Sequence, residues 1–356
     1  MKKKIVAVTG ATGHLGNNVV RILLQAQYSV RVLLFPGCKI GEASLRDLDV
    51  QIFLGDVFIK ETLHDFLKGV DFVVHLAGII SIDGDQGGKV YDVNVQGTAN
   101  VCDVALKMNV QRLVHMSTIH VFDFLSYGKP INEKTISSSL DIHGHYAHSK
   151  RMGEKEVRKR VEKGLDAIIL NPTGIIGPFD YEPSRMGRFF LDIFYGRLPS
   201  IVCGGFHWID IRDVARAVLF AFEKGKRNES YIVSNTFYSI RQLYEISHEI
   251  TGLKIPFMET PLGLAYLGIP FAKLVSLILG NEPLITEESL DTLRTNMEVD
   301  CTKAKTVLGF NPRPMEETIT DIYFWFIKKH FIDIEKEKGF KREKLEKLIK
   351  SKSFKR

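Results

Sequence analysis

Three glycines near the start of the chain restrict its fold more than any other feature. Gly10, Gly13 and Gly16 lie between an apolar run at residues 5–8 and a run with helical period at 13–27. A buried strand that turns into a helix through closely spaced glycines is the arrangement that binds the pyrophosphate of a dinucleotide. Gly10 permits the tight turn, Gly13 lets the backbone approach the phosphates, and Gly16 lets helix and strand pack closely. The predicted cofactor-binding residues of this turn are Gly10, Thr12, Gly13, His14, Leu15 and Gly16.

The first half of the chain alternates short apolar runs with segments of helical period. This alternation predicts an α/β fold of the Rossmann type, a doubly wound parallel sheet that is buried on both faces. The predicted strands are 4–9, 29–35, 50–54, 71–76, 111–117 and 166–171, and the predicted helices are 13–27, 60–68, 88–108 and 146–163. A ligand of such a sheet is expected outside the carboxyl ends of its strands.

The second half is more irregular and predicts a smaller C-terminal lobe that recognises substrate. Its expected elements are helices at 185–196, 211–224 and 240–251 and a strand at 231–234. The predicted domains are residues 1–175 for the dinucleotide, 176–334 for the lobe, with some segments returning to the sheet, and a basic tail at 335–356. Because the tail lacks a convincing apolar face, we expect it to be frayed or partly disordered.

The net charge of +6 is a property of this tail. Residues 335–356 hold ten Lys and Arg against four Glu, so the rest of the chain is neutral overall. A neutral body does not favour nucleic-acid binding, and phosphate binding must come from local geometry.

Other sequence features predict an enzyme without metal, located in the cytoplasm. The four cysteines lack metal-binding spacing, and no apolar signal segment opens the chain. The apolar run at 261–280 contains Pro270 and Lys273 and is a poor membrane span. We expect an ordinary helix pair there, with peripheral membrane contact through this run and the tail as the lesser alternative.

Tyr146 and Lys150 are four residues apart in a predicted helix, so their polar ends share one face. A neighbouring ammonium, and a nicotinium ring, favour phenolate and are expected to lower the pKa of the phenol. The phenol can then exchange a proton with a carbonyl or alcohol oxygen. This spacing alone is also typical of a surface pair. Ser117 and Thr118, which end an apolar strand, add hydroxyls where a substrate oxygen would lie.

With these pieces, the chain resembles the extended short-chain dehydrogenase/reductase family, also called the NAD-dependent epimerase/dehydratase family, over about residues 3–330. The motifs are at residues 9–16, 55–57, 75–78, 93–98, 117–118, 146–150, 171–178 and 208–215, and a closing segment at 300–310 is similar too.

The resemblance implies roles for individual residues. Thr118, Tyr146 and Lys150 would be catalytic, with Thr118 aligned through Val121 and with Ser117 as its neighbour at the cofactor. The further cofactor-binding residues implied are Asp56 and Val57 at the adenine, Leu76, Ala77 and Gly78, Asn94 in the scaffold, Lys150 at the nicotinamide ribose, and Pro172, Thr173, Gly174 and Ile175 around the nicotinamide.

The choice between NADP and NAD depends on the segment after the second strand. An acid there would bind the ribose hydroxyls of NAD, whereas a cation would pair with the 2′-phosphate of NADP. Residues 33–39 contain no acid, and Lys39 is the nearby cation. NADP is therefore the preferred prediction and NAD the alternative, since Lys39 is equally typical of a solvated loop lysine.

The substrate is predicted from the composition of residues 185–215 and 261–280. The first region holds Phe189, Phe190, Phe194, Tyr195, Phe206 and Trp208. This apolar character resembles the branch that reduces dihydroflavonols or oxidises 3β-hydroxysteroids, and it predicts hydride transfer to a ketone, or from a secondary alcohol, on a ring-containing molecule. An aromatic stripe is also typical of a core.

Two other functions stay open. A nucleotide-sugar epimerase or dehydratase with tightly bound NAD would use clustered basic residues, for which Arg185, Arg188, Arg197 and Arg212 are available. Arg185 and Arg188 form a diphosphate clamp or a solvated face. A cofactor-sensing regulator is disfavoured by the intact Tyr146, Lys150 and Thr118. The resemblance further suggests a homodimer through the helices near 88–108 and 146–163.

Overall fold

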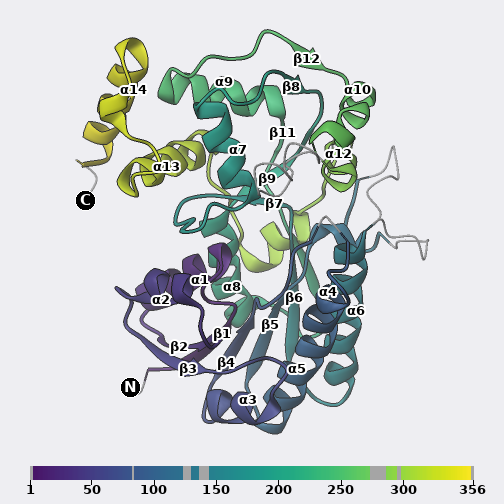
Figure 1. Ribbon diagram of the computed structural model, residues 1–356. Helices are drawn as coiled ribbons and strands as arrows, with labels where there is room; N and C mark the ends of the chain where they lie inside the picture. Colours follow the sequence, from purple (N-terminus) through teal and green to yellow (C-terminus); the bar gives the residue numbers. More distant parts are fainter. Residues whose placement is uncertain are drawn as a thin grey trace. The chain divides into compact units, whose positions relative to one another are not determined.

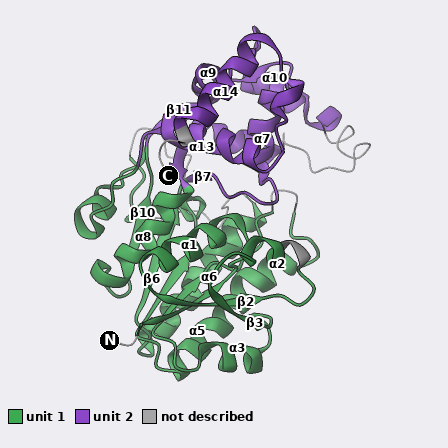
Figure 2. Ribbon diagram, turned by 90° about the vertical axis from the view of Figure 1, so that its left-hand side faces the viewer, with its two compact units in different colours: residues 1–173, 211–235, 298–312 green, residues 174–210, 236–297, 313–356 purple. Residues whose placement is uncertain are grey.

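The computed structural model describes residues 3–81, 84–122, 130–135, 144–272, 286–294 and 298–353 (Figure 1). The side chains of Lys39, Ile40, Glu42, Lys352 and Ser353 lie outside the described part. The chain divides into two compact units, coloured separately in Figure 2. Unit 1 comprises residues 1–173, 211–235 and 298–312, and unit 2 comprises 174–210, 236–297 and 313–356.

Unit 1 is built on a seven-stranded parallel sheet with the order β10-β6-β5-β4-β1-β2-β3. Its strands are β1 (Ile5–Thr9), β2 (Ser29–Leu34), β3 (Val50–Leu54), β4 (Phe72–His75), β5 (Arg112–Met116), β6 (Ala167–Pro172) and β10 (Ser230–Val233). The predicted doubly wound sheet is confirmed, with all six strands of the first half. The strand order reverses between β1 and β4, so the segments after these two strands lie together at the switch point where such sheets bind ligands.

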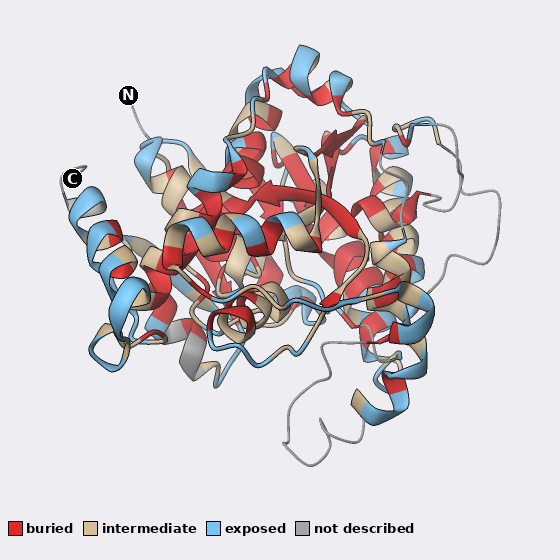
Figure 3. Ribbon diagram, turned by 90° about the horizontal axis from the view of Figure 1, so that it is seen from above, coloured by how far each residue is buried: buried red, intermediate tan, exposed pale blue. Residues whose placement is uncertain are grey.

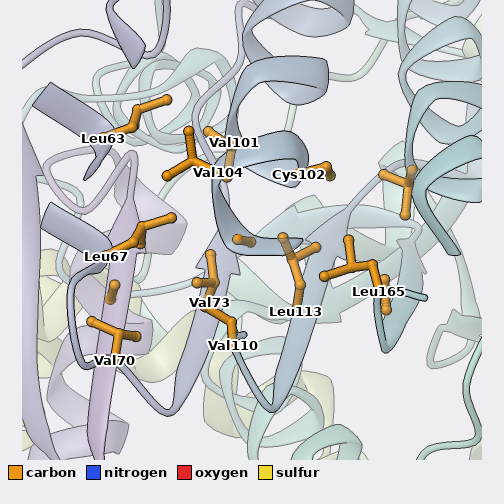
Figure 4. Close-up of a cluster of buried hydrophobic side chains, with 14 of the residues drawn as sticks. Leu63, Leu67, Val70, Val73, Val101, Cys102, Val104, Val110, Leu113 and Leu165 are labelled. Carbon is orange, nitrogen blue, oxygen red and sulfur yellow. The ribbon is translucent and has the colours of Figure 1, made fainter. Parts of the chain in front are cut away.

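Helices cover both faces of this sheet. On one face, α1 (His14–Gln25) packs against α8 (Ile211–Lys224); on the other lie α3 (Lys60–Leu67), α5 (Thr98–Lys107) and α6 (His145–Glu162). Figure 4 shows how Leu63 and Leu67 of α3, Val101 and Val104 of α5, and Val73 and Leu113 of the sheet form one buried cluster. Apolar side chains of strands and helices are thus buried together, and Figure 3 draws the buried residues in red.

The predicted helix at 88–108 is continuous but irregular. It consists of α4 (Lys89–Tyr91), a π-helical segment η1 (Asp92–Gly97) and α5. A π-helical turn inside an α-helix often marks a functional position, and this one carries Asn94. The remaining elements of unit 1 are α2 (Lys39–Leu45), η2 (Ile119–Val121) and η3 (Ala304–Leu308).

Unit 2 contains small sheets and helices. A three-stranded sheet has the order β11-β9-β7, and β8 pairs with β12. The strands are β7 (Gly174–Ile176), β8 (Ile201–Val202), β9 (Gly205–Asp210), β11 (Phe237–Ser239) and β12 (Glu259–Thr260). The helices are α7 (Arg185–Phe194), α9 (Ile240–Thr251), α10 (Leu262–Leu267), α12 (Glu287–Leu293), α13 (Met315–Lys328), η4 (Ile334–Lys336) and α14 (Gly339–Ser353).

The basic tail differs from the prediction of a frayed segment. It forms α14, in which Leu345 is fully buried and Leu348 is 6% exposed. Its Lys341 donates a hydrogen bond to the carbonyl oxygen of Phe194, at 2.9 Å. The prediction was wrong because two leucines one turn apart are enough to dock a short helix when its remaining side chains stay solvated.

Among the described residues, no helix has the length and apolar character to cross a bilayer, and no group of three or more His, Cys, Asp or Glu side chains is placed to hold a metal ion. The predicted apolar helix pair is described as far as Ala272, and residues 273–280 lie outside the described part.

Candidate functional site

The glycine-rich turn follows β1 and touches the segment after β4. Gly10 has a φ of 69°, and a Cβ atom there would lie 2.6 Å from the amide nitrogen of Ala77. A Cβ atom at Gly16 would collide with the carbonyl oxygen of Gly10 and lie 2.7 Å from the Cα atom of Ala11. Gly10 is therefore needed for two reasons, because its φ is positive and because backbone atoms leave no room for a side chain. Gly16 lets α1 pack closely against the same turn.

Gly13 is different because it is exposed. The nearest atom to a Cβ at Gly13 would be the Gly10 carbonyl oxygen, 3.6 Å away. Gly13 is the N-cap of α1, and the N-terminus of a helix carries a partial positive charge that favours an anion. Packing does not demand a glycine at this position, so an open backbone beside helix amides fits a phosphate group. The side chain of Thr12 belongs to the same turn, and a Cβ atom at Gly41 of α2 would lie 2.5 Å from its methyl group.

The residues predicted to bind the adenosine half of the cofactor follow β2 and β3. Lys39 is the first residue of α2, and its side chain lies outside the described part of the chain. The carboxylate of Asp56 accepts a hydrogen bond from the backbone amide of Phe58, at 3.0 Å, and so shapes the turn before α3. Val57 is buried, and a Cβ atom at Gly97 would lie 2.8 Å from it.

Asn94 joins the segment after β4 to α6. Its side-chain oxygen accepts from the amide of Ile79, and its nitrogen donates to the Ile79 carbonyl oxygen and to the Ser149 hydroxyl, each at 2.9 Å. A Cβ atom at Gly78 would lie 2.8 Å from the Asn94 oxygen and 3.8 Å from Lys150 Nζ. Gly78 is exposed. The absence of a side chain at Gly78 allows the close approach to Asn94, and Gly78 also lies near the Lys150 ammonium.

His75 completes a buried hydrogen-bond chain that the sequence did not reveal. The Ala77 amide donates to Thr9 Oγ1 (3.3 Å), which lies 2.8 Å from His75 Nδ1. His75 Nε2 lies 3.0 Å from Thr98 Oγ1, whose hydroxyl donates to the Asn94 carbonyl oxygen at 2.7 Å. This pattern assigns the neutral tautomer with its proton on Nε2. Burial, followed by a nearby ammonium, lowers the pKa of His75 to about 3, so the ring stays neutral.

Tyr146 lies in the first turn of α6 and forms a hydrogen bond with the side chain of Thr118. Burial raises the pKa of Tyr146 to about 12, and the Thr118 hydrogen bond opposes this rise. The direction is opposite to the one expected from the sequence. That expectation considered the charge of Lys150 but not the removal of the phenol from water, which disfavours phenolate.

Lys150 is buried on the same face of α6. Its Nζ atom donates to the carbonyl oxygen of Met116 at 2.6 Å. Burial lowers the pKa of Lys150 to about 8, and the carboxylate of Glu154 opposes the fall. Of the three residues predicted to be catalytic, Thr118 and Tyr146 share a hydrogen bond, and Lys150 lies one turn further along α6.

Glu154 is a second residue that the sequence analysis missed. Its Oε1 atom accepts from Asn171 Nδ2 at 2.7 Å, and burial raises the pKa of its carboxyl. The signal was present in the sequence, because Glu154 follows Lys150 by the same four-residue step that separates Lys150 from Tyr146.

The neighbouring hydroxyls after β5 have different surroundings. Thr118 shares a hydrogen bond with Tyr146, whereas the Ser117 hydroxyl is buried near the carboxyl of Glu154. Thr118 also accepts from the amide of His120 at 3.3 Å, which caps η2. Val121 ends this short helix and is buried.

The last predicted cofactor segment crosses from unit 1 to unit 2. Pro172 and Thr173 are buried in unit 1, where the Thr173 hydroxyl donates to the Ser234 oxygen at 3.2 Å. Gly174 and Ile175 begin β7 in unit 2. A Cβ atom at Gly174 would lie 2.6 Å from the ring of Trp208, so close packing of β7 on β9 requires this glycine.

The aromatic residues predicted around the substrate are largely core residues of unit 2. Phe190, Phe194, Phe206 and Trp208 are all buried. The rings of Phe206 and Trp208 lie 5.6 Å apart. Packing therefore accounts for this composition, and it no longer supports a particular substrate.

The basic residues considered for a diphosphate belong to different elements of the fold. Arg185 and Arg188 are partly buried in the first turn of α7, and Arg197 pairs with Asp192 at 2.9 Å. Arg212 belongs to α8 in unit 1.

Comparison with known proteins identifies relatives along almost the whole chain. The chain is 32% identical to "Sterol demethylase protein B" of Methylococcus capsulatus over 91% of this chain and 99% of that protein. It is 29% identical to a "Putative dihydroflavonol 4-reductase" of Synechocystis, over 90% and 93%. It is 27% identical to "3 beta-hydroxysteroid dehydrogenase type 7" of Mus musculus, over 90% and 95%.

A solved structure has the same fold. The crystal structure of gox2253 is 30% identical and superposes with a TM-score of 0.81, covering 93% of this chain and 100% of the other. The model of the family described as "NAD dependent epimerase/dehydratase family" matches residues 6–234. That match includes the glycine-rich turn, the hydrogen-bond chain through His75 and the Tyr146–Lys150 face, and the chain belongs to the NAD-dependent epimerase/dehydratase family.

Proposed function

We propose that this enzyme transfers a hydride between NADP and a ketone or secondary alcohol on a fairly apolar, ring-containing molecule. It is an NAD(P)-dependent reductase or dehydrogenase of the extended short-chain type. The observation that carries the proposal is the hydrogen bond between Tyr146 and Thr118, with the buried Lys150 one turn further along the same helix.

These three residues can perform the proton transfer. Because the pKa of Tyr146 is about 12, the phenol keeps its proton at neutral pH and can donate it to a carbonyl oxygen. Thr118 holds the phenol and offers a second polar contact for the same oxygen. Lys150 adds a positive charge that stabilises the phenolate left after the transfer.

The segments at the switch point would hold the dinucleotide. Gly10, Gly13 and Gly16, with the start of α1, would bind its pyrophosphate, and Asp56 and Val57 would border the adenine. Leu76 to Gly78 and Pro172 to Ile175 would border the nicotinamide, and Lys150 its ribose. The bound nicotinamide nucleotide supplies or accepts the hydride.

The substrate class is supported by the relatives. The names of three relatives refer to a sterol, a dihydroflavonol and a 3β-hydroxysteroid, all of which are fused or linked ring systems. Such a molecule would present a ketone, or a secondary alcohol, to Tyr146. A ketosteroid and a dihydroflavonol are therefore the first substrates to assay with NADPH.

Tyr146→Phe tests the site. Because the phenol oxygen carries the proton, we expect turnover to fall by roughly 10²- to 10⁴-fold while NADPH affinity is kept. Tyr91→Phe, which removes a hydroxyl from an exposed residue of α4, is the matched control. Unchanged turnover of the Tyr146→Phe variant would exclude Tyr146 as the proton donor.

Lys39→Ala tests the preference for NADP. If Lys39 pairs with the 2′-phosphate, its loss should weaken NADPH binding and leave NADH binding unchanged, as measured by fluorescence titration. An unaltered ratio of the two affinities would remove the basis for preferring NADP.

The alternative, a nucleotide-sugar epimerase, makes a different prediction about the purified protein. Such an enzyme would retain NAD through dialysis and would not oxidise added NADPH with apolar ketones. That combination of results would replace the reductase proposal with the epimerase.

A further inference from the structure

Four ionisable side chains lie along one face of α6 at intervals of four residues. They are Tyr146, Lys150, Glu154 and Arg158, in the order phenol, ammonium, carboxylate, guanidinium. Side chains four residues apart in a helix are neighbours. Glu154 therefore lies between two cations, one turn beyond Lys150.

Glu154 is also tied to the strand end that carries Thr118. Its Oε1 atom accepts from Asn171 Nδ2 at 2.7 Å, and the same nitrogen donates to the carbonyl oxygen of Thr118 at 3.1 Å. Asn171 is fully buried in β6. The carboxylate, the amide and the Thr118 backbone thus form one connected group.

Among the described residues, Glu154 is the carboxylate whose charge acts on Lys150. From β4 and β5, His75 and His115 lie close enough for the ammonium to lower their pKa values, and burial keeps both rings neutral. From α6, Tyr146 is a neutral phenol, and Glu154 raises the pKa of Lys150 against the effect of burial. Arg158 acts on Glu154 from the next turn and lowers the pKa of its carboxyl.

We propose that Glu154 is a positioning residue of the reaction, whose carboxylate keeps Lys150 in its ammonium form and, through Asn171, holds the backbone of Thr118. This inference rests on the proposed roles of Tyr146, Thr118 and Lys150. Glu154 acts on the reacting atoms only through these neighbours.

Glu154→Gln is the decisive variant because glutamine keeps an oxygen for Asn171 and removes the charge. Without the carboxylate, Lys150 should lose its proton at lower pH. We expect the alkaline decline of kcat/KM to move to lower pH by about one pH unit. Glu156→Gln is the matched control, since Glu156 belongs to the same helix and pairs with Lys159 and Arg160 instead.

A second measurement does not depend on turnover. Acetic anhydride modifies the neutral amine, so the pH dependence of acetylation of Lys150, followed by mass spectrometry in substrate-free protein, reports its protonation. In Glu154→Gln protein, labelling should begin at lower pH by the same amount, and in Glu156→Gln protein it should not move.

The outcomes separate the two proposals. If Tyr146→Phe abolishes turnover but Glu154→Gln shifts neither the alkaline decline nor the labelling of Lys150, the role of Glu154 is wrong and the proposed function stands. If Tyr146→Phe keeps full turnover, the proposed function fails, and labelling still decides the effect of Glu154 on Lys150. Should Glu154→Gln not fold, Glu154→Asp, which retains the charge, must keep the Lys150 labelling profile within about half a pH unit of wild type; a larger shift overturns the proposal.

Discussion

Alanine substitutions at Gly13 and Gly16 separate the two uses of glycine in the turn after β1. At Gly16 a methyl group would collide with the Gly10 carbonyl oxygen and lie 2.7 Å from the Ala11 Cα atom. Backbone atoms cannot move aside as a flexible side chain can, so the turn and α1 must separate. We expect Gly16→Ala to lower the free energy of unfolding by about 1–3 kcal/mol.

At Gly13 the same methyl group meets only an ordinary contact at 3.6 Å. The backbone there has φ −70° and ψ 167°, which alanine adopts without strain. Stability should change by no more than about 1 kcal/mol, the usual difference between good and poor N-cap residues. If a phosphate approaches this backbone, however, the methyl group removes a hydrogen bond to a charged group, a loss of about 1.5–3 kcal/mol. NADPH should therefore bind roughly 10- to 100-fold more weakly.

Urea unfolding and NADPH fluorescence titration measure the two effects. Gly263→Ala is a suitable control, because a Cβ atom there would have open space around it in α10. Wild-type NADPH affinity in Gly13→Ala protein would refute the approach of the phosphates to Gly13. Wild-type stability in Gly16→Ala protein would refute the packing argument.

Three further predictions concern pH and stability. Because the pKa of Lys150 is about 8, ketone reduction should be steady below pH 8 and fall about tenfold per pH unit above it; a flat profile up to pH 10 would contradict this. In the described part of the chain, the ring nitrogens of His115 have no hydrogen-bond partner, and burial lowers its pKa well below the usual value. As pH falls below about 6.5, the unfolded chain takes up a proton that the folded one does not, so stability is lost. In the His115→Leu variant, the free energy of unfolding should depend less on pH in this range. At pH 7 it should equal the wild-type value or exceed it by up to about 3 kcal/mol, as measured by urea unfolding. Leu345→Ala should destabilise unit 2 by about 2–5 kcal/mol without weakening NADPH binding; unaltered unfolding would mean that α14 is frayed.

Much of the fold could be predicted because its signals are local. A strand such as Ile5–Thr9 is a short apolar run, and α1 shows a clear helical period after its glycines. The place of β10 in the sheet could not be read in the same way. Four residues at 230–233 predict a strand, but its pairing with β6 depends on tertiary contacts.

The candidate site shows the same division. Tyr146 and Lys150 are recognisable because their spacing alone places them on one helical face. The raised pKa of Tyr146 was mispredicted because burial depends on elements far away in the sequence. The pairing of His75 with Thr9 and Thr98 brings together residues 66 and 23 positions apart, which no local pattern can indicate.

The buried hydrogen bonds around His75 bear on the engineering of this enzyme. All the donors point the same way along the chain of hydrogen bonds, from the Ala77 amide through Thr9, His75 and Thr98 to the carbonyl oxygen of Asn94. The side-chain amide of Asn94 then donates to Ser149, whose hydroxyl donates to the carbonyl oxygen of Tyr146. A graft that replaces β1 and its turn with those of a relative must therefore supply a hydroxyl at position 9. Otherwise Nδ1 of His75 is left in the core without a hydrogen-bond donor, and the disturbance reaches α6, the helix that carries Tyr146. A variant that takes β1 and its turn from a relative should therefore exchange residues 9, 75 and 98 together.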